Sequence, residues 1–174
     1  MISLSRVRQV ANLDAKDDSK LLALKSQVVE QFVQLTGKVW STYTNRLDYY
    51  DLSHEHCRLV PLKVANATVS LVEYLSLPDW ITFTDDYIVV RDALRSSVDL
   101  PMTLRVTASG GYADDAAPAQ ILEAIALQVR FLLERNQTGR VALKSKNFEG
   151  GDGVFMEIHP MYRDAIAQNR WRMP

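Results

Sequence analysis

The stretch His54-Glu55-His56-Cys57 contains the residue types that could hold a metal ion. On a strand, His54 and His56 would point to the same face, because side chains alternate along a strand. Zinc sites use three or four protein ligands. The only other histidine, His159, lies about a hundred residues away, and Cys57 is the only cysteine. We therefore expect a polar loop between two strands here, and no metal site.

Two glycine-rich stretches resemble phosphate-binding loops only in their glycine content. Residues 150–153 (Gly-Gly-Asp-Gly) lack the Lys-Ser/Thr pair of such a loop, and no apolar strand leads into them. Gly110-Gly111 follows a strand-like run, but Asp114 and Asp115 would place two carboxylates where a phosphate should bind. We expect a surface loop in the first case and no anion site in the second.

The sequence contains no nucleophile signature such as GxSxG or HExxH. The paired carboxylates Asp85-Asp86 and Asp114-Asp115 are adjacent residues, which do not face one another on a strand. They indicate a turn and the start of a helix. The sequence therefore predicts no catalytic residues, no cofactor and a protein that is not an enzyme.

Trp171 stands between Arg170 and Arg172 near the end of the chain. A terminal aromatic side chain can pack back on its own core, or it can anchor a partner. Aromatic residues and arginine are the types enriched at binding hot spots. Both interpretations stay open at this stage.

Two helices are predicted at the start of the chain. Ser3 is placed to cap a short helix through about Val10, and Asp17 to cap a longer one with Asp18 in its first turn. Gly37 stands where a left-handed C-cap is expected. The apolar stripe of the longer helix is spaced by three or four residues and consists of Leu21, Leu24, Val28, Phe32 and Leu35.

The segment from Val39 to Thr107 is rich in Val, Thr, Tyr, Trp and Ile and has no helical period, which favours strands. The runs 80–84 and 87–90 flank the turn signal Asp85-Asp86 and are predicted to form a hairpin. The other strand candidates are residues 39–49, 58–60, 67–74 and 102–107.

A long helix is predicted from Pro118 to Asn136, and a short one begins at Pro160. The long helix is apolar around nearly its whole circumference, so it must be buried nearly all round. Either it is the central helix of the fold, or a neighbouring subunit covers one side. The predicted class is α+β: a helical bundle built from the N- and C-terminal helices, with a β-rich insertion of antiparallel strands between them.

The composition suits one domain in 174 residues, of which 47% are hydrophobic and 24% charged. The formal net charge is −1, whereas proteins that grip DNA usually carry a basic excess. Residues 1–20 lack the apolar region of a signal peptide, and Ile121–Leu133 is too short and too polar to span a bilayer. We expect a protein made in the cytoplasm, with no membrane partner.

The order of these elements resembles the head–tail connector (adaptor) family of long-tailed bacteriophages over nearly the whole chain. The strongest part runs from Leu104 through Gly110-Gly111-Tyr112 and a short acidic loop to Pro118 and the helix ending at Asn136. Further matches are Leu35-Thr36-Gly37 after the N-terminal helix, Arg58-Leu-Val-Pro-Leu followed by Val69-Ser-Leu-Val, and Tyr162-Arg163 with Trp171. Residues Lys144–Val154 do not align with the family pattern.

The resemblance implies a single connector domain over residues 1–174, with 1–37 helical, 39–109 a β-rich insertion and 118–174 helical with a basic aromatic end. It implies a ring, commonly of twelve copies, that lies under the portal protein, extends the DNA channel and offers a platform to a neck or tail-completion protein. The protein would belong to the virion neck, after assembly in the host cytoplasm. The family has no catalytic residues to carry over.

The C-terminal segment of the family commonly docks the portal. The expected portal contacts are therefore Tyr162, Arg163, Arg170, Trp171 and Arg172. The long apolar helix supplies surface for a ring interface, and the expected subunit contacts on it are Leu122, Val129 and Leu133. A nearly neutral subunit suits a channel through which genomic DNA slides without sequence-specific binding.

Two alternatives remain. The protein could serve at another station of the same virion, as a tail terminator or another neck or tail-completion protein. Less in keeping with the residues, it could be a small metal-binding enzyme that uses His54, His56 and Cys57.

Overall fold

The structure, a computed structural model, describes residues 1–13, 18–52, 57–90, 92–137 and 158–170. The chain forms two compact units, one helical and one β-rich. Of the described residues, those within 2–35 and 117–169 form the helical unit, and those within 36–116 form the β-rich unit together with Met1 and Arg170. The predicted α+β class, with antiparallel strands between terminal helices, is confirmed.

The N-terminal helices are those that the capping residues predicted. Helix α1 (Leu4–Ala11) begins after Ser3, whose Oγ accepts a hydrogen bond from the Arg6 N–H at 3.1 Å. Helix α2 (Asp18–Thr36) ends before Gly37, which adopts a positive φ of 67°. The proposed cap Asp17 lies outside the described residues.

The apolar stripe of α2 was predicted correctly except at its last position. Leu21, Leu24, Val28 and Phe32 are buried, but Leu35 is 40% exposed. Thr36, four residues after Phe32, is buried instead, and its Oγ1 accepts a hydrogen bond from Trp40 Nε1 at 3.0 Å. The 4-residue spacing therefore continues to Thr36, where a hydrogen bond permits a polar side chain to be buried.

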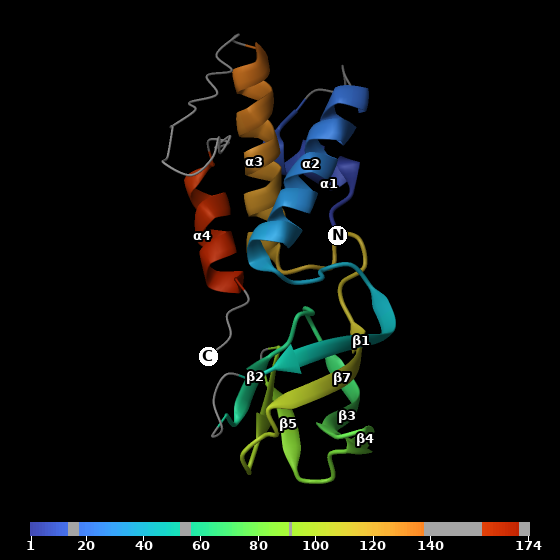
Figure 1. Cartoon of the computed structure of the whole chain (residues 1–174). Helices are drawn as coiled ribbons and strands as arrows, with labels where there is room; N and C mark the ends of the chain where they lie inside the picture. The colour runs from blue at the N-terminus through green and yellow to red at the C-terminus, as the bar shows by residue number, and fades with distance from the viewer. Residues whose placement is uncertain (14–17, 53–56, 91, 138–157, 171–174) are drawn as a thin grey trace. The chain divides into compact units, whose positions relative to one another are not determined.

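Helix α3 (Ala119–Gln137) is the central helix of the helical unit, the first of the two possibilities that its apolar circumference left open. It contacts α1 along one side and α4 (Pro160–Asn169) along another, and Figure 1 shows α4 on one side of α3 with α1 and α2 on the other. Most side chains in its first half are buried: Ile121, Leu122, Ala124, Ile125, Ala126, Gln128 and Val129. Its own chain therefore supplies most of the cover that the helix requires.

The β-rich unit contains two antiparallel sheets. The first has the order β1–β7–β3–β4, and the second has the order β2–β6–β5. Their bounds are β1 (Tyr43–Asp51), β2 (Leu59–Pro61), β3 (Thr68–Ser76), β4 (Asp79–Thr82), β5 (Tyr87–Val90), β6 (Ala93–Ser96) and β7 (Thr103–Gly110).

The predicted hairpin of residues 80–84 with 87–90 is wrong. Strand β4 pairs with β3 across Leu77 and Pro78, and β5 pairs with β6, a short strand that was not predicted. Phe83 is buried, and its N–H donates to Val72 O at 2.8 Å. The chain leaves the first sheet only after Phe83, so residues on the two sides of Asp85-Asp86 belong to different sheets.

The two sheets enclose one hydrophobic core. Side chains from both sheets meet in it, and its buried members are Tyr50, Leu52, Val60, Leu62, Val64, Val72, Phe83, Leu94, Leu100, Leu104, Val106 and Ala108. Because side chains alternate along a strand, the residues between these core positions point away from the core on both sheets. Each sheet therefore has one buried face and one outward face.

Candidate docking surface

Helix α4 carries two of the residues expected to touch a portal, and Tyr162 is the one that holds the helix in place. The Tyr162 side chain is fully buried, and its hydroxyl donates to Val28 O of α2 at 2.7 Å. Its ring lies 5.7 Å from the Phe32 ring, centroid to centroid. Tyr162 therefore positions α4 against α2, and its side chain is not part of the surface that a partner could reach.

A second buried hydrogen bond ties the start of α4 to α3. Gln128 is fully buried, and its Oε1 accepts the His159 N–H at 2.7 Å. The His159 and Phe131 rings meet edge to face, with 6.1 Å between centroids. Sequence reasoning missed Gln128, because a lone glutamine in an apolar helix has no local signal of its partner.

The other face of α4 is open to solvent. Met161 is 41% exposed, and the Arg163 and Asp164 side chains are exposed to 71% and 62%. Arg170 follows the helix directly and is also exposed. Trp171 and Arg172 lie outside the described residues. Of the expected portal contacts, Arg163 and Arg170 are thus reachable, and Met161 is a further exposed residue of the same helix.

The residues expected at a subunit interface on α3 differ in exposure. Leu122 and Val129 are buried within the helical unit, whereas Leu133 is half-buried in the last turns of the helix. The first two are core residues of a single copy. Leu133, with the half-buried Phe131 and Leu132 beside it, is the part of this set that a neighbour could still cover.

Replacement of Tyr162 by phenylalanine is expected to lower the free energy of unfolding by about 1 kcal/mol, because one buried hydrogen bond is lost while the ring packing stays. Burial also raises the pKa of the Tyr162 hydroxyl above its ordinary value of 10.0. A raised folded-state pKa means that the stability is present in full below about pH 10 and is lost as the pH rises further. Urea unfolding from pH 7 to pH 11 should show that decline, and the Y162F variant should show a shallower one. An identical alkaline decline in both proteins would contradict this assignment.

Buried tyrosines of the β-rich unit contribute to the same loss of unfolding free energy at alkaline pH. Burial, followed by the charges of Asp92 and Asp48, raises the pKa of Tyr43 to about 12. Burial also raises the pKa of Tyr50, whose hydroxyl oxygen accepts the Lys63 N–H at 3.0 Å. Y162F should therefore reduce the decline and not abolish it.

The described residues provide no support for the metal-binding alternative. His54 and His56 lie outside them, and Cys57 is half-buried with its Sγ donating to Leu59 O at 3.1 Å. Within the described ranges, no three His, Cys, Asp or Glu side chains gather closely enough to hold a metal ion. In the same ranges, no helix has the length and apolar character needed to cross a membrane.

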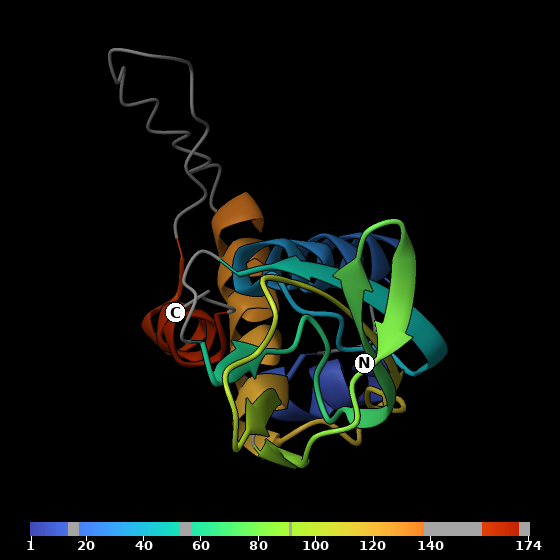
Figure 2. The same cartoon turned by 60° about the horizontal axis from the view of Figure 1, so that its bottom comes forward.

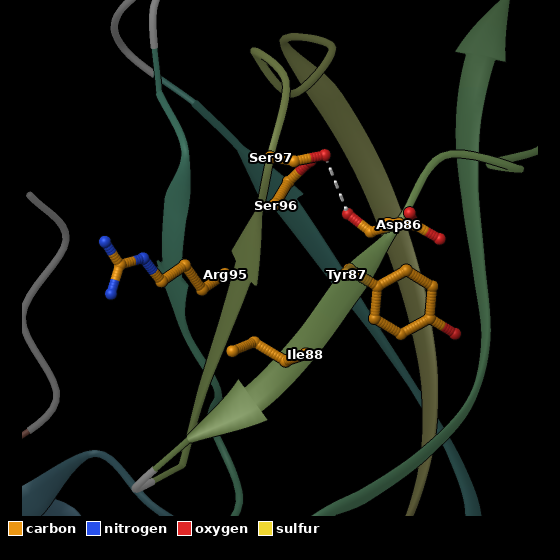
Figure 3. Close-up of a pocket in the computed structure, with 6 residues that line it drawn as sticks. All are labelled: Asp86, Tyr87, Ile88, Arg95, Ser96 and Ser97. Atoms are coloured by element: carbon orange, nitrogen blue, oxygen red, sulfur yellow. Dashed lines mark hydrogen bonds between the residues drawn. The ribbon is translucent and has the colours of Figure 1, made fainter.

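A shallow pocket of about 250 Å³ lies beside β5 and β6 (Figure 3). It is lined by Asp86, Tyr87, Ile88, Arg95, Ser96 and Ser97. The Ser97 hydroxyl donates to the backbone oxygen of Asp86 at 3.4 Å and not to a side-chain base. These lining residues therefore show no activated nucleophile.

Comparison with known proteins adds a fold relationship. No protein-family model matches the chain, and no curated protein matches its sequence. Among solved structures, a chain in the neck of the empty GTA particle, computed with C6 symmetry, is 13% identical with a TM-score of 0.52 and covers 98% of this chain and 92% of that chain. A chain of the virion of the native gene transfer agent (GTA) particle is 16% identical with a TM-score of 0.52, over 99% and 90% of the two chains.

A third similar chain comes from the neck of the native GTA particle computed with C12 symmetry, at 14% identity and a TM-score of 0.50, over 98% and 91% of the two chains. At sequence identities this low, the structural likeness shows a shared fold alone. Since the likeness spans nearly the full length of both chains, it concerns the helical and β-rich units together. The expected resemblance to head–tail connectors is thereby confirmed at the level of the fold.

Proposed function

We propose that this chain, which shares its fold with chains from the necks of gene transfer agent particles, is a structural protein of a virion neck. Its role there is that of a head–tail connector that forms a ring under the portal and offers a docking platform to a neck or tail-completion protein. The main support for the proposal is the fold likeness to a GTA neck chain, which extends over 98% of this chain. The protein works without catalysis, in the virion neck, after assembly in the host cytoplasm.

The ring consists of identical copies joined head to tail. A head-to-tail contact uses two different surfaces of each copy and closes into a ring when the rotation between copies fits. The similar GTA necks were computed with C6 and C12 symmetry, which supports a ring of twelve copies here.

Genomic DNA passes through the ring without sequence-specific binding. Lys and Arg total 20 and Asp and Glu total 21, so the subunit carries a net charge of −1. A strongly basic wall would hold the phosphates of DNA and slow its passage. The nearly neutral charge of the chain therefore favours movement of DNA through the ring without tight binding.

The portal binds the exposed face of α4 and the segment that follows it. Met161 and Arg163 are among its exposed side chains on the helix, and Arg170 follows the helix directly. Trp171 and Arg172 extend the same basic and aromatic segment in the sequence. The buried Tyr162 acts on this contact only by holding the helix.

The proposal is tested by cryo-electron microscopy of the full chain mixed with the portal protein of its own particle. We expect a ring of this chain on the portal, and replacement of Arg163 by glutamate should weaken portal binding about tenfold, because a charge at the edge of an interface is reversed. The matched control is Arg130→Glu on α3, where an exposed arginine pairs with Glu134 at 2.6 Å. It should bind as the unaltered chain does.

Location of this chain outside the neck of the intact particle would refute the proposal. Binding to the tail tube with no binding to the portal would instead identify it as a tail terminator.

A further inference from the structure

The outward faces of the two sheets carry several large apolar side chains among their polar ones. Antiparallel sheets that face water normally alternate between apolar core positions and polar outward positions. Here, large hydrophobic side chains are exposed on both sheets at outward positions: Leu47, Tyr49 and Leu71 on the first, and Leu59, Ile88 and Val90 on the second. Exposed apolar patches of this kind mark interaction surfaces.

On the outward face of the first sheet, here called the aromatic face, Arg, Trp and Tyr side chains contact one another, and these residue types are enriched at binding hot spots. Arg105 of β7 donates two hydrogen bonds to Glu73 of β3, at 2.6 and 2.8 Å. Its guanidinium lies 4.6 Å from the Trp80 ring centroid, and the Tyr49 ring lies 5.8 Å from the same ring. Trp80 belongs to the β3–β4 hairpin, which extends away from the rest of the β-rich unit in Figure 2.

The charges of the aromatic face leave one carboxylate without an ion-pair partner. Arg105 holds the pKa of Glu73 below its ordinary value through their hydrogen bonds, so these two charges neutralise each other. Asp51 shares the outward side of β1 with Leu47 and Tyr49 and is exposed. Among the described residues it has no ion-pair partner.

The outward face of the second sheet, here called the Arg95 face, carries the opposite charge. Arg95 pairs across the sheet with Leu59 on one side and Ile88 on the other, and the next row is Pro61, Ala93 and Val90. Figure 3 shows the Arg95 and Ile88 side chains on the same side of the sheet, with Tyr87 on the other. Within the described strands, Arg95 is the one charged residue of this face and has no ion-pair partner there.

We infer that the aromatic face of one copy packs on the Arg95 face of the next copy, with Arg95 beside Asp51. The two sheets enclose a single core, so these faces point in different directions and each copy can engage two neighbours. Both faces expose large apolar side chains, and each contains one charge, opposite in sign to that of the other face, that has no ion-pair partner among the described residues. This complementarity favours the pairing of the two faces. The two faces are different surfaces of the same chain, and such a contact generates a ring when the rotation between copies closes. The inference rests on the proposed ring and names the surfaces that close it.

The test reverses the charge at one of the two positions in each of two variants. Ring formation is then measured in the mixture of full chain and portal protein. Arg95→Glu alone places two carboxylates together at every contact, and Asp51→Arg alone places two guanidinium groups together. Each variant should weaken ring formation by about 100-fold or more, since like charges at a desolvated contact cost several kcal/mol. An equimolar mixture of the two variants should restore rings, because every contact in a ring of alternating variants again joins one carboxylate to one guanidinium.

Three outcomes must be distinguished: a variant that misfolds, a chain that forms no ring, and a ring that is closed by other faces. Both residues are exposed, so circular dichroism and the melting temperature of each variant should match the unaltered chain. Arg95→Lys, which keeps the charge, should form rings, and so should Leu22→Ser, which changes an exposed leucine of α2. Rings formed by either charge variant alone, or no recovery in the mixture of two folded variants, would overturn the inference. If the unaltered chain forms no ring, the proposed function itself fails.

Discussion

Replacement of Gly111 by alanine is expected to lower the free energy of unfolding by about 3–5 kcal/mol, through backbone strain and a direct clash. Gly111 has a φ of +79°, a conformation that costs any residue with a Cβ. A Cβ at this position would lie 2.1 Å from Ser41 O and 2.8 Å from Thr42 N. These are backbone atoms, so no side-chain rotation can relieve the contact.

The close approach at Gly111 has a structural purpose. Its N–H donates to Ala65 O at 3.0 Å, and the next residue, Tyr112, donates its N–H to Trp40 O at 2.8 Å. The Trp40 and Tyr112 rings stack with 6.1 Å between centroids. The segment after β7 is thereby joined to the segment before β1, and a displaced Gly111 would break that connection.

Urea unfolding of Gly111→Ala beside Ser109→Ala measures the effect. The control lies two residues away and removes two exposed hydrogen bonds with Asn45. Ser109 Oγ accepts the Asn45 N–H at 2.9 Å and donates to Asn45 Oδ1 at 3.5 Å, and their loss should cost about 1 kcal/mol. A loss for Gly111→Ala no larger than that of the control would contradict the close approach described here.

Replacement of Leu122 by alanine is expected to cost about 2–5 kcal/mol of unfolding free energy in the isolated subunit, because a buried side chain leaves a cavity. Leu122 is 3% exposed on α3, within the helical unit of one copy. The loss should be independent of protein concentration, since the cover comes from the same chain. Had Leu122 been a contact between subunits, its loss would weaken the ring and leave the free subunit nearly unchanged.

Leu133→Ala is the comparison on the same helix. Leu133 is half-buried near the end of α3, so its truncation should cost about 1 kcal/mol or less in the free subunit. Thermal unfolding of both variants over a range of concentrations distinguishes the two positions. Equal losses at both, or a loss at Leu122 that appears only in assembled rings, would contradict the assignment of Leu122 to the core.

The local features of the helices could be read from the chain itself. Ser3, Gly37 and Pro160 each stand at a helix boundary that the structure confirms, because capping depends on residues within one turn of the helix end. The stripe from Leu21 to Phe32 is buried as its spacing predicted. The resemblance of the element order to head–tail connectors agrees with the fold likeness to GTA neck chains.

The sequence by itself thus determined the helix boundaries at Ser3, Gly37 and Pro160, and the class of the fold. Tertiary structure alone decided which strands pair, because the turn signal Asp85-Asp86 also suits a hairpin of β4 with β5, whereas β4 pairs with β3 and β5 with β6. It also decided that Tyr162 is buried and Arg163 exposed, since an aromatic residue in a short helix can serve the core or a partner equally well. The pairing register, finally, places Arg95 and Asp51 on outward faces, and no spacing along the chain contains that information.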